Sequence, residues 1–156
     1  MVGQVTVHGK ESLFLYKKTP FGVGRFVKAK IVQGWLVAVP IAAAITAISL
    51  TLVPQASAVS LLAYIVFIVL LVAANVALAL GLALLNPQFS ESARAQMGGL
   101  MLNANVAMFA SIGVFIGSMV VLDLGIFNTL LLQNAVIWLL GIIFLYLGKM
   151  KLSRIE

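Results

Sequence analysis

The sequence has no cysteine and a single histidine, His8, and these absences exclude several kinds of chemistry. Without cysteine the chain forms no disulfide, no thiolate metal site and no cysteine nucleophile. It also contains no HExxH, Walker, nucleophile-elbow or dinucleotide-binding motif. A lone histidine outside such a motif is far more often a plain surface residue than a catalyst. The sequence therefore predicts a protein that is not an enzyme and that needs neither cofactor nor metal.

Charged residues are equally scarce. They make up 9% of the chain, whereas hydrophobic residues make up 63%. Soluble domains are about a quarter charged and about half apolar, so a soluble fold could not hide this much apolar surface. The net charge of +6 could suggest nucleic-acid binding, but the basic residues gather at the two ends of the chain. Such placement is typical of membrane topology signals and of contacts with anionic lipid.

The chain contains long apolar runs without a charged residue. At ~1.5 Å per residue each run is long enough to cross a hydrocarbon core of ~30 Å as a helix. Uniformly apolar runs of this length exclude the short alternating strands of a barrel. We expect an all-α integral membrane four-helix bundle. The expected segments are a basic N-terminal segment (1–30), spans at 31–53, 59–85, 97–122 and 130–148 within a transmembrane domain (31–148), and a basic tail (149–156).

The distribution of lysine and arginine predicts the orientation. The N-terminal segment, the loop after the second span and the C-terminal tail all carry basic residues, and the other two loops carry none. Because basic segments stay on the cytoplasmic side, both termini are predicted to be cytoplasmic.

Small residues recur at four-residue spacing in two of the spans. They are Ala73, Ala77 and Gly81 in the second span and Gly113 and Gly117 in the third. Small side chains allow helix backbones to approach closely, so all five are candidates for helix packing. Packing inside one bundle is favoured over a subunit interface, and both remain open.

Amides are the polar groups inside the spans. The candidates for the lining of a translocation path are Asn75, Asn103, Asn105 and Asn134. Unpaired amides in hydrocarbon are costly, so these side chains are expected to face protein or a cavity. Interhelical hydrogen bonds are the favoured alternative. No lysine, arginine, aspartate or glutamate lies deep in a span, which argues against an ion-coupled transporter.

The N-terminal segment contains a helix start at Thr19-Pro20, with threonine as N-cap and proline at the first helical position. Beyond it, Val23, Phe26 and Val27 share one side of a helix. This pattern predicts a short amphipathic helix on the cytoplasmic face, ahead of the first span. A flexible basic arm is the alternative.

Two segments resemble permease subunits of ATP-binding-cassette (ABC) exporters. The stretch LFLYKKTPFGVGRFVKAK is similar to the segment that precedes a span in these permeases, with matches at Pro20, Gly22, Phe26 and Lys30. The stretch GLALLNPQFSESARAQMGGLMLN resembles the loop that follows a long helix, with matches at Pro87, Phe89 and Glu91. The resemblance covers the membrane-embedded C-terminal part of such a permease. Those permeases have six or more spans, whereas four are expected here.

The resemblance implies a non-enzymatic permease subunit, or a fragment of one, driven by a separate cytoplasmic ATP-binding subunit. It also implies a second membrane chain or a second copy, and a prokaryotic plasma membrane as the location. The implied ATPase-docking residues are Pro20, Arg25, Phe26, Lys28, Pro87, Phe89 and Glu91. The alternatives are a small membrane scaffold or accessory subunit, and a homo-oligomeric channel or carrier. The substrate is not readable from the sequence.

Overall fold

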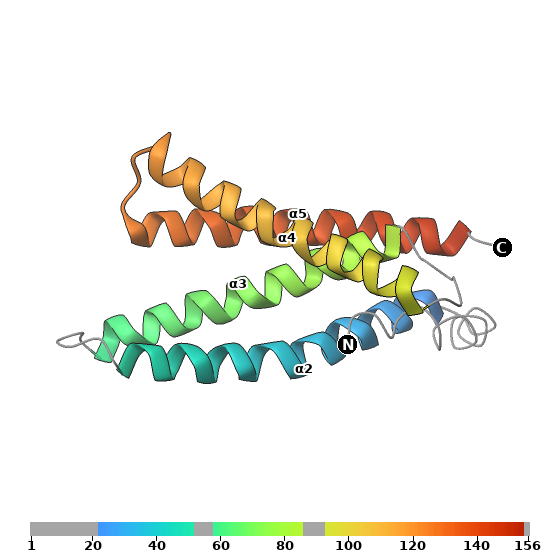
Figure 1. The fold of residues 1–156 in the computed structure, drawn as a ribbon, viewed down its shortest axis with the longest axis horizontal. Helices are drawn as coiled ribbons and strands as arrows, with labels where there is room; N and C mark the ends of the chain where they lie inside the picture. The colour runs from blue at the N-terminus through green and yellow to red at the C-terminus, as the bar shows by residue number, and fades with distance from the viewer. Residues whose placement is uncertain (1–21, 52–57, 86–92, 155–156) are drawn as a thin grey trace.

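The structure is a computed structural model, and it describes residues 22–51, 58–85 and 93–154. Within these ranges the chain is entirely helical apart from one turn (Figure 1). The helices are α2 (Gly22–Thr51), α3 (Ala58–Leu85), α4 (Ala93–Val120) and α5 (Ile126–Arg154). The predicted all-α, four-helix class is confirmed.

Each of the four helices is long and apolar enough to cross a membrane. Their outer faces carry large hydrophobic side chains, such as Leu36, Phe109 and Val120, which are 71%, 66% and 76% exposed. Exposed apolar surface on this scale is stable in lipid and not in water. The chain is therefore an integral, multi-pass helical membrane protein.

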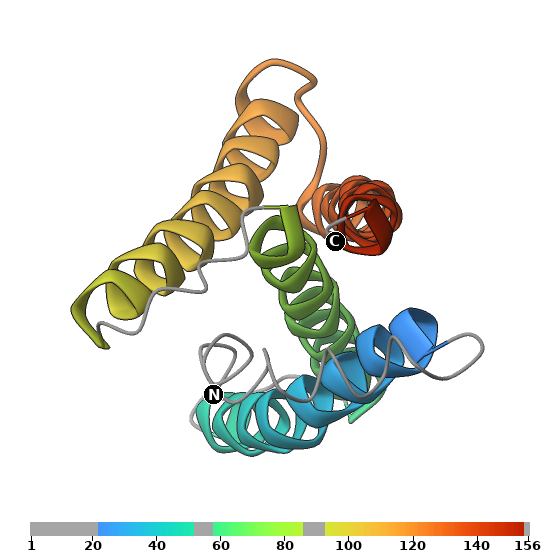
Figure 2. The same cartoon turned by 90° about the vertical axis from the view of Figure 1, so that its right-hand side faces the viewer.

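The helix α3 is the centre of the arrangement, because it packs against each of the other three and most extensively against α5 (Figure 2). The chain alternates in direction from one helix to the next, so α3 and α5 run parallel to each other (Figure 1). The helices α2 and α4 lie on different flanks of α3 and share almost no contact among the described residues. The bundle is therefore built on one central pair with two flanking helices.

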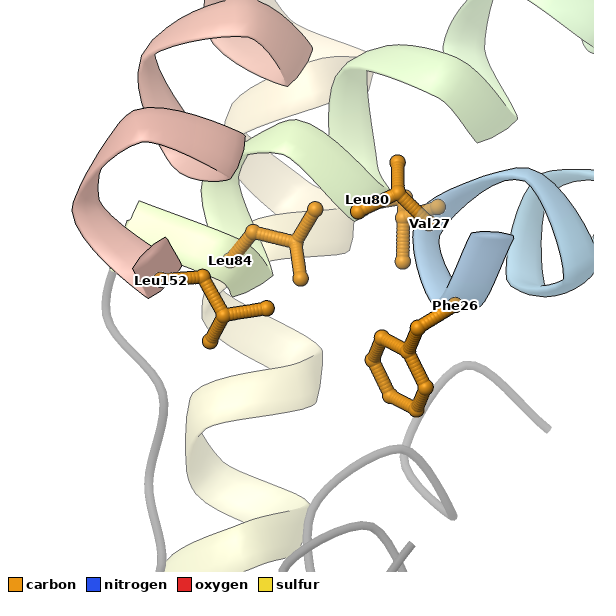
Figure 3. Packing of buried hydrophobic residues seen from close by; sticks show 5 residues of the cluster. All are labelled: Phe26, Val27, Leu80, Leu84 and Leu152. Carbon is orange, nitrogen blue, oxygen red and sulfur yellow. The ribbon is translucent and has the colours of Figure 1, made fainter. Parts of the chain in front are cut away.

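One uninterrupted helix, α2, covers both the end of the predicted amphipathic segment and the first span. This differs from the expected separate helix on the membrane face, because no turn separates residues 22–30 from the span. Phe26 and Val27 are 3% and 6% exposed, and they pack in one cluster with Leu80, Leu84 and Leu152 (Figure 3). The apolar side of this segment thus contacts α3 and α5. The helix also continues through Pro40.

The turn between α4 and α5 is fixed by its own hydrogen bonds. The amide of Leu124 donates to the carbonyl of Ser118 at 3.2 Å, and the hydroxyl of Thr129 donates to the carbonyl of Leu124 at 3.2 Å. Asp123 adopts a left-handed backbone conformation (φ 49°), which aspartate tolerates better than most residues. Thr129 is fully buried, so α5 starts from a packed position.

Candidate functional site

The parallel pair α3–α5 keeps one register along its length. Asn134 contacts Phe67, a Cβ at Gly141 would contact Ala74, and a Cβ at Gly148 would contact Gly81. Each step is seven residues on both helices, which is the repeat of left-handed supercoiled pairs. Glycine at two of these contact positions allows the backbones to meet.

Close approach in this pair depends on the absence of side chains. A Cβ at Gly81 would lie 2.8 Å from the backbone nitrogen of Leu145 and from the carbonyl carbon of Phe144. A Cβ at Gly148 would lie 2.6 Å from the Cβ of Leu84. Ala73 and Ala77, which share the four-residue spacing with Gly81, are 8% and 1% exposed. The small residues of α3 therefore lie in the packed centre of the bundle.

The glycines of α4 have a different environment. Among the described residues, nothing lies within 4 Å of a Cβ built at Gly113 or at Gly117. Gly113 is exposed and Gly117 is half-buried. This face of α4 is not used for packing inside the described bundle.

Asn134 joins α5 to α3 near the start of both helices. Its Nδ2 donates to the carbonyl of Phe67 at 3.2 Å and to the carbonyl of Leu130, on its own helix, at 3.0 Å. The side chain is 7% exposed, and its Oδ1 is buried without a partner. Asn134 lies at a helix contact and lines neither of the grooves described below.

Gln133 joins α5 to α4. Its Nε2 donates to both the backbone carbonyl and the hydroxyl of Ser111, each at 2.9 Å. Gln133 and Ser111 are 5% and 7% exposed, and the Oε1 of Gln133 is buried without a partner. The sequence shows a glutamine inside a span, but a serine in an apolar helix carries no signal that identifies it as the partner.

The other three candidate path-lining residues differ in exposure. Asn75 is half-buried on α3 and donates to the carbonyl of Leu71 on the same helix at 2.9 Å. On α4, Asn103 is half-buried and Asn105 is exposed. The hydrogen bonds of Asn75 and Asn134 go to backbone carbonyls, and the lining of a path by the four asparagines stays a prediction.

A groove of about 370 Å³ lies between α3 and α4. Its lining is apolar except for Asn75 from α3 and Ser111 from α4. The hydroxyl oxygen of Ser111 also accepts a hydrogen bond from Gln133, which joins this wall of the groove to α5. Asn75 is the one predicted path-lining residue that lines it.

A second groove, of about 460 Å³, lies where α2 meets α3 and α5. Two tryptophans form its wall: Trp35 and Trp138 make an edge contact with ring centroids 6.0 Å apart. The Nε1 of Trp35 donates to the carbonyl of Ala73 at 3.0 Å, which fixes the ring against α3. Its remaining lining is apolar, and Pro40 is part of it.

Basic side chains surround the end of the bundle where α2 starts and where α3 and α5 end. Arg25, Lys28, Lys149 and Arg154 are exposed, and the side chain of Lys149 lies 3.7 Å from a Cβ built at Gly24. The Nζ of Lys151 donates to the carbonyl of Leu85 at 2.6 Å, so this lysine caps the end of α3.

The residues implied to dock an ATPase are only partly within the described ranges. Pro20, Pro87, Phe89 and Glu91 lie outside them. Arg25 and Lys28 are exposed on the first turns of α2. Phe26 is 3% exposed and packs in the cluster of Figure 3, so its ring is not presented to a partner.

In the described parts of the chain, no group of three histidine, cysteine, aspartate or glutamate side chains is arranged to hold a metal ion. Comparisons of the chain with protein-family models, with curated proteins and with solved structures find no match.

Proposed function

We propose that this chain is a membrane-spanning permease subunit, or part of one, of an exporter driven by a separate cytoplasmic ATP-binding subunit. The proposal is supported by the resemblance of the N-terminal segment and of the 86–96 loop to ABC permeases. One structural observation favours it further: the start of α2 and the ends of α3 and α5 are joined by a single apolar cluster. Arg25 and Lys28 are exposed beside this cluster, on a helix that is packed in place.

This arrangement suits mechanical coupling to a partner. A protein that binds Arg25 and Lys28 would push on α2 where Phe26 and Val27 contact the ends of α3 and α5. Movement at this surface would then reach three helices together. In this proposal the basic end faces the cytoplasm of a prokaryotic cell, as the positive-inside rule requires, and both termini lie on that side.

Charge reversal at the basic surface tests the proposal. The double variant Arg25→Glu with Lys28→Glu should abolish co-purification of an ATP-binding protein in mild detergent, because like charges then face the partner's contacts. The control variant Arg25→Lys with Lys28→Arg keeps both charges and should retain the partner. Both variants must remain in the membrane fraction. A double-reversal variant that still recovers an ATP-binding protein in near-equal amount would contradict docking at this surface.

A homo-oligomeric channel or carrier is a second candidate, and the α4 face with Gly113 and Gly117 favours it. Nothing among the described residues covers these glycines, and GxxxG pairs allow close contact between copies of a helix. The same purification separates the candidates. A homo-oligomer without an ATP-binding protein supports the channel or carrier, and a different membrane complex supports an accessory subunit.

A further inference from the structure

The groove walled by the two tryptophans, where α2 meets α3 and α5, opens toward the bilayer. Two of its lining residues, Val32 and Leu36, are 50% and 71% exposed. None of the lining residues is ionisable. The ring of Trp35 is held by its hydrogen bond to the carbonyl of Ala73, so the wall of the groove is already in place. The groove therefore suits a hydrocarbon chain that enters sideways from lipid.

The face of α2 that lines this groove also carries a lysine at the basic end of the bundle. Trp35 and Val39 follow Lys28 by seven and eleven residues, a spacing that places side chains on one face of a helix. Lys28 is exposed. Eleven residues of helix span about 16 Å, which matches one leaflet, or half of a hydrocarbon core of ~30 Å. Lys28 therefore lies about one acyl chain's length from the deep end of the groove.

The helix α5 repeats this arrangement. Leu145 and Lys149 follow Trp138 by seven and eleven residues, so all three lie on one face of α5. The Cε and Nζ atoms of Lys149 lie 3.7 Å from a Cβ built at Gly24, which shows that this side chain reaches α2. Gly24 and Lys28 are on successive turns of one face of α2. Two lysines from two helices therefore lie above the same groove.

These two lysines have no counter-charge among the described residues. No hydrogen bond or ion pair is recorded there for Lys28 or Lys149. Asp123 is the one acidic side chain in the described ranges, and it lies in the turn at the opposite end of the bundle (Figure 1). Neighbouring cations repel each other, and an anion between them replaces repulsion with attraction. The charges at this end therefore favour an anion above an apolar groove.

We propose that this groove binds one anionic phospholipid. The phosphate lies between Lys28 and Lys149, and one acyl chain follows α2 into the groove along Trp35 and Trp138. Lysines near a membrane surface attract anionic lipid, and here they are combined with a formed groove for the chain. Such a lipid fills the space between α2 and α5 and joins the two helices at their basic ends.

The charges favour this occupant over two others. A second copy of the chain, inserted in the same orientation, brings its own basic end to the same side of the membrane, and like charges oppose the contact. A zwitterionic lipid carries an ammonium group that is repelled by the two lysines. An anionic lipid has neither disadvantage.

The lipid site does not rest on the proposed ATP-binding partner, because binding needs only the groove and the two lysines. Lys28 also belongs to the proposed docking surface, whereas Lys149 does not. The experiment therefore changes Lys149.

The experiment uses the purified full chain in phosphatidylcholine vesicles, without an ATP-binding protein. The probes are phosphatidylglycerol and phosphatidylcholine with the same photoreactive diazirine on one acyl chain, added in separate samples. After irradiation, mass spectrometry of peptides should place the phosphatidylglycerol label on residues 32–40 and around Trp138. Each lysine contributes a factor of about five, so the anionic probe should label the groove about 25-fold more than the zwitterionic probe. Label on the exposed face of α4 measures ordinary lipid contact, and its ratio should be close to one.

Two variants at the end of α5 test the head group. Lys149→Gln removes one charge and should lower labelling of the groove by phosphatidylglycerol about fivefold, with labelling by phosphatidylcholine unchanged. Arg154→Gln is the matched control, because it removes the same charge from an exposed position on the same helix end. Arg154 follows Trp138 by sixteen residues, which places it on the opposite side of α5. This variant should leave the labelling unchanged.

A second pair of variants tests the position of the chain. Val39→Phe fills the deep end of the groove from a half-buried position and should remove the label from the groove with both probes. Ile45→Phe, at an exposed position on α2 outside the groove, is its control and should change nothing.

Three results overturn the proposal. Equal labelling of the groove by both probes contradicts the anionic head group. Equal losses in Lys149→Gln and Arg154→Gln show attraction to the basic end as a whole, without a two-lysine site. Unchanged labelling in Val39→Phe, or a cross-link to a second copy in the groove without lipid label, contradicts the place of the chain. Retention of an ATP-binding protein by the Arg25 and Lys28 variant contradicts docking alone, so the two proposals can fail separately.

Discussion

The pair α3–α5 and the helix α4 use the same kind of residue with opposite results. In the pair, Gly81 and Gly148 face the partner helix at distances that exclude any Cβ. In α4, Gly113 and Gly117 have no neighbour within 4 Å of a Cβ among the described residues. Water does not drive helices together inside a bilayer, so a small-residue motif stabilises only where a second backbone lies against it. A small-residue motif makes close packing possible, but packing occurs only where another helix lies against the motif.

The largest effect on stability is expected from a substitution in the closely packed α3–α5 pair. Gly81→Ala places a Cβ 2.8 Å from backbone atoms of Phe144 and Leu145, which cannot move aside without shifting α5. We expect the free energy of unfolding to fall by about 1–3 kcal/mol. Thermal unfolding of the purified protein in detergent measures the change.

The matched control for that variant is Gly113→Ala on α4, where no described residue lies against the glycine. Alanine is the better helix former by roughly 0.5–1 kcal/mol, and nothing described lies near the added methyl group. Stability should therefore be unchanged or slightly raised. A clear loss of stability in Gly113→Ala, or an equal loss in both variants, would contradict the distinction between the two regions.

An intermediate effect is expected at the amide that joins the pair. Asn134→Leu removes the bond from Nδ2 to the carbonyl of Phe67 and also removes the unpartnered Oδ1. Because these two changes partly offset each other, we expect a loss of about 0.6–2 kcal/mol in the same unfolding assay. Asn105→Leu, at an exposed position on α4, should change stability by less than about 0.5 kcal/mol. The reverse order would show that the α4 amide has the more important partner.

The smallest effect on stability is expected at the C-terminal end of α3, where Lys151 contacts Leu85. Lys151→Met removes the charged cap on the carbonyl of Leu85, and cations at a helix C-terminus contribute about 0.3–1 kcal/mol. Amide exchange in the last turn of α3 should accelerate, while exchange in the middle of α3 should not. Lys149→Met is the control, since no hydrogen bond to α3 is recorded for Lys149 among the described residues. Faster exchange along the whole helix would show that Lys151 has a larger role.

The sequence alone was sufficient for the four membrane-spanning helices of the described residues and for the membrane class. Length and hydropathy carry that information, and both are strong in all four spans. It was insufficient for the start of α2. An apolar side that includes Phe26 and Val27 is compatible with contact to lipid or to protein, and only the positions of Leu80 and Leu152 show that protein covers it.

The candidate site was harder to foresee, because these helices are apolar on all sides and their faces cannot be separated by periodicity. The amides were visible as costly groups in a span, but their partners were not. Asn134 and Gln133 are neighbours in sequence and yet bind different helices, α3 and α4. Their positions in the sequence do not show which helix each amide contacts.

The parallel register of α3 and α5 has a consequence for synthesis of the protein. The two helices that fit each other best are separated along the chain by all of α4. During translation α3 enters the membrane first, and its seam of Ala74, Ala77 and Gly81 has no partner until Gly141 and Gly148 have been made. The central pair therefore assembles late. Until α5 has been inserted, the small-residue face of α3 that packs against α5 is exposed to lipid and to other membrane proteins.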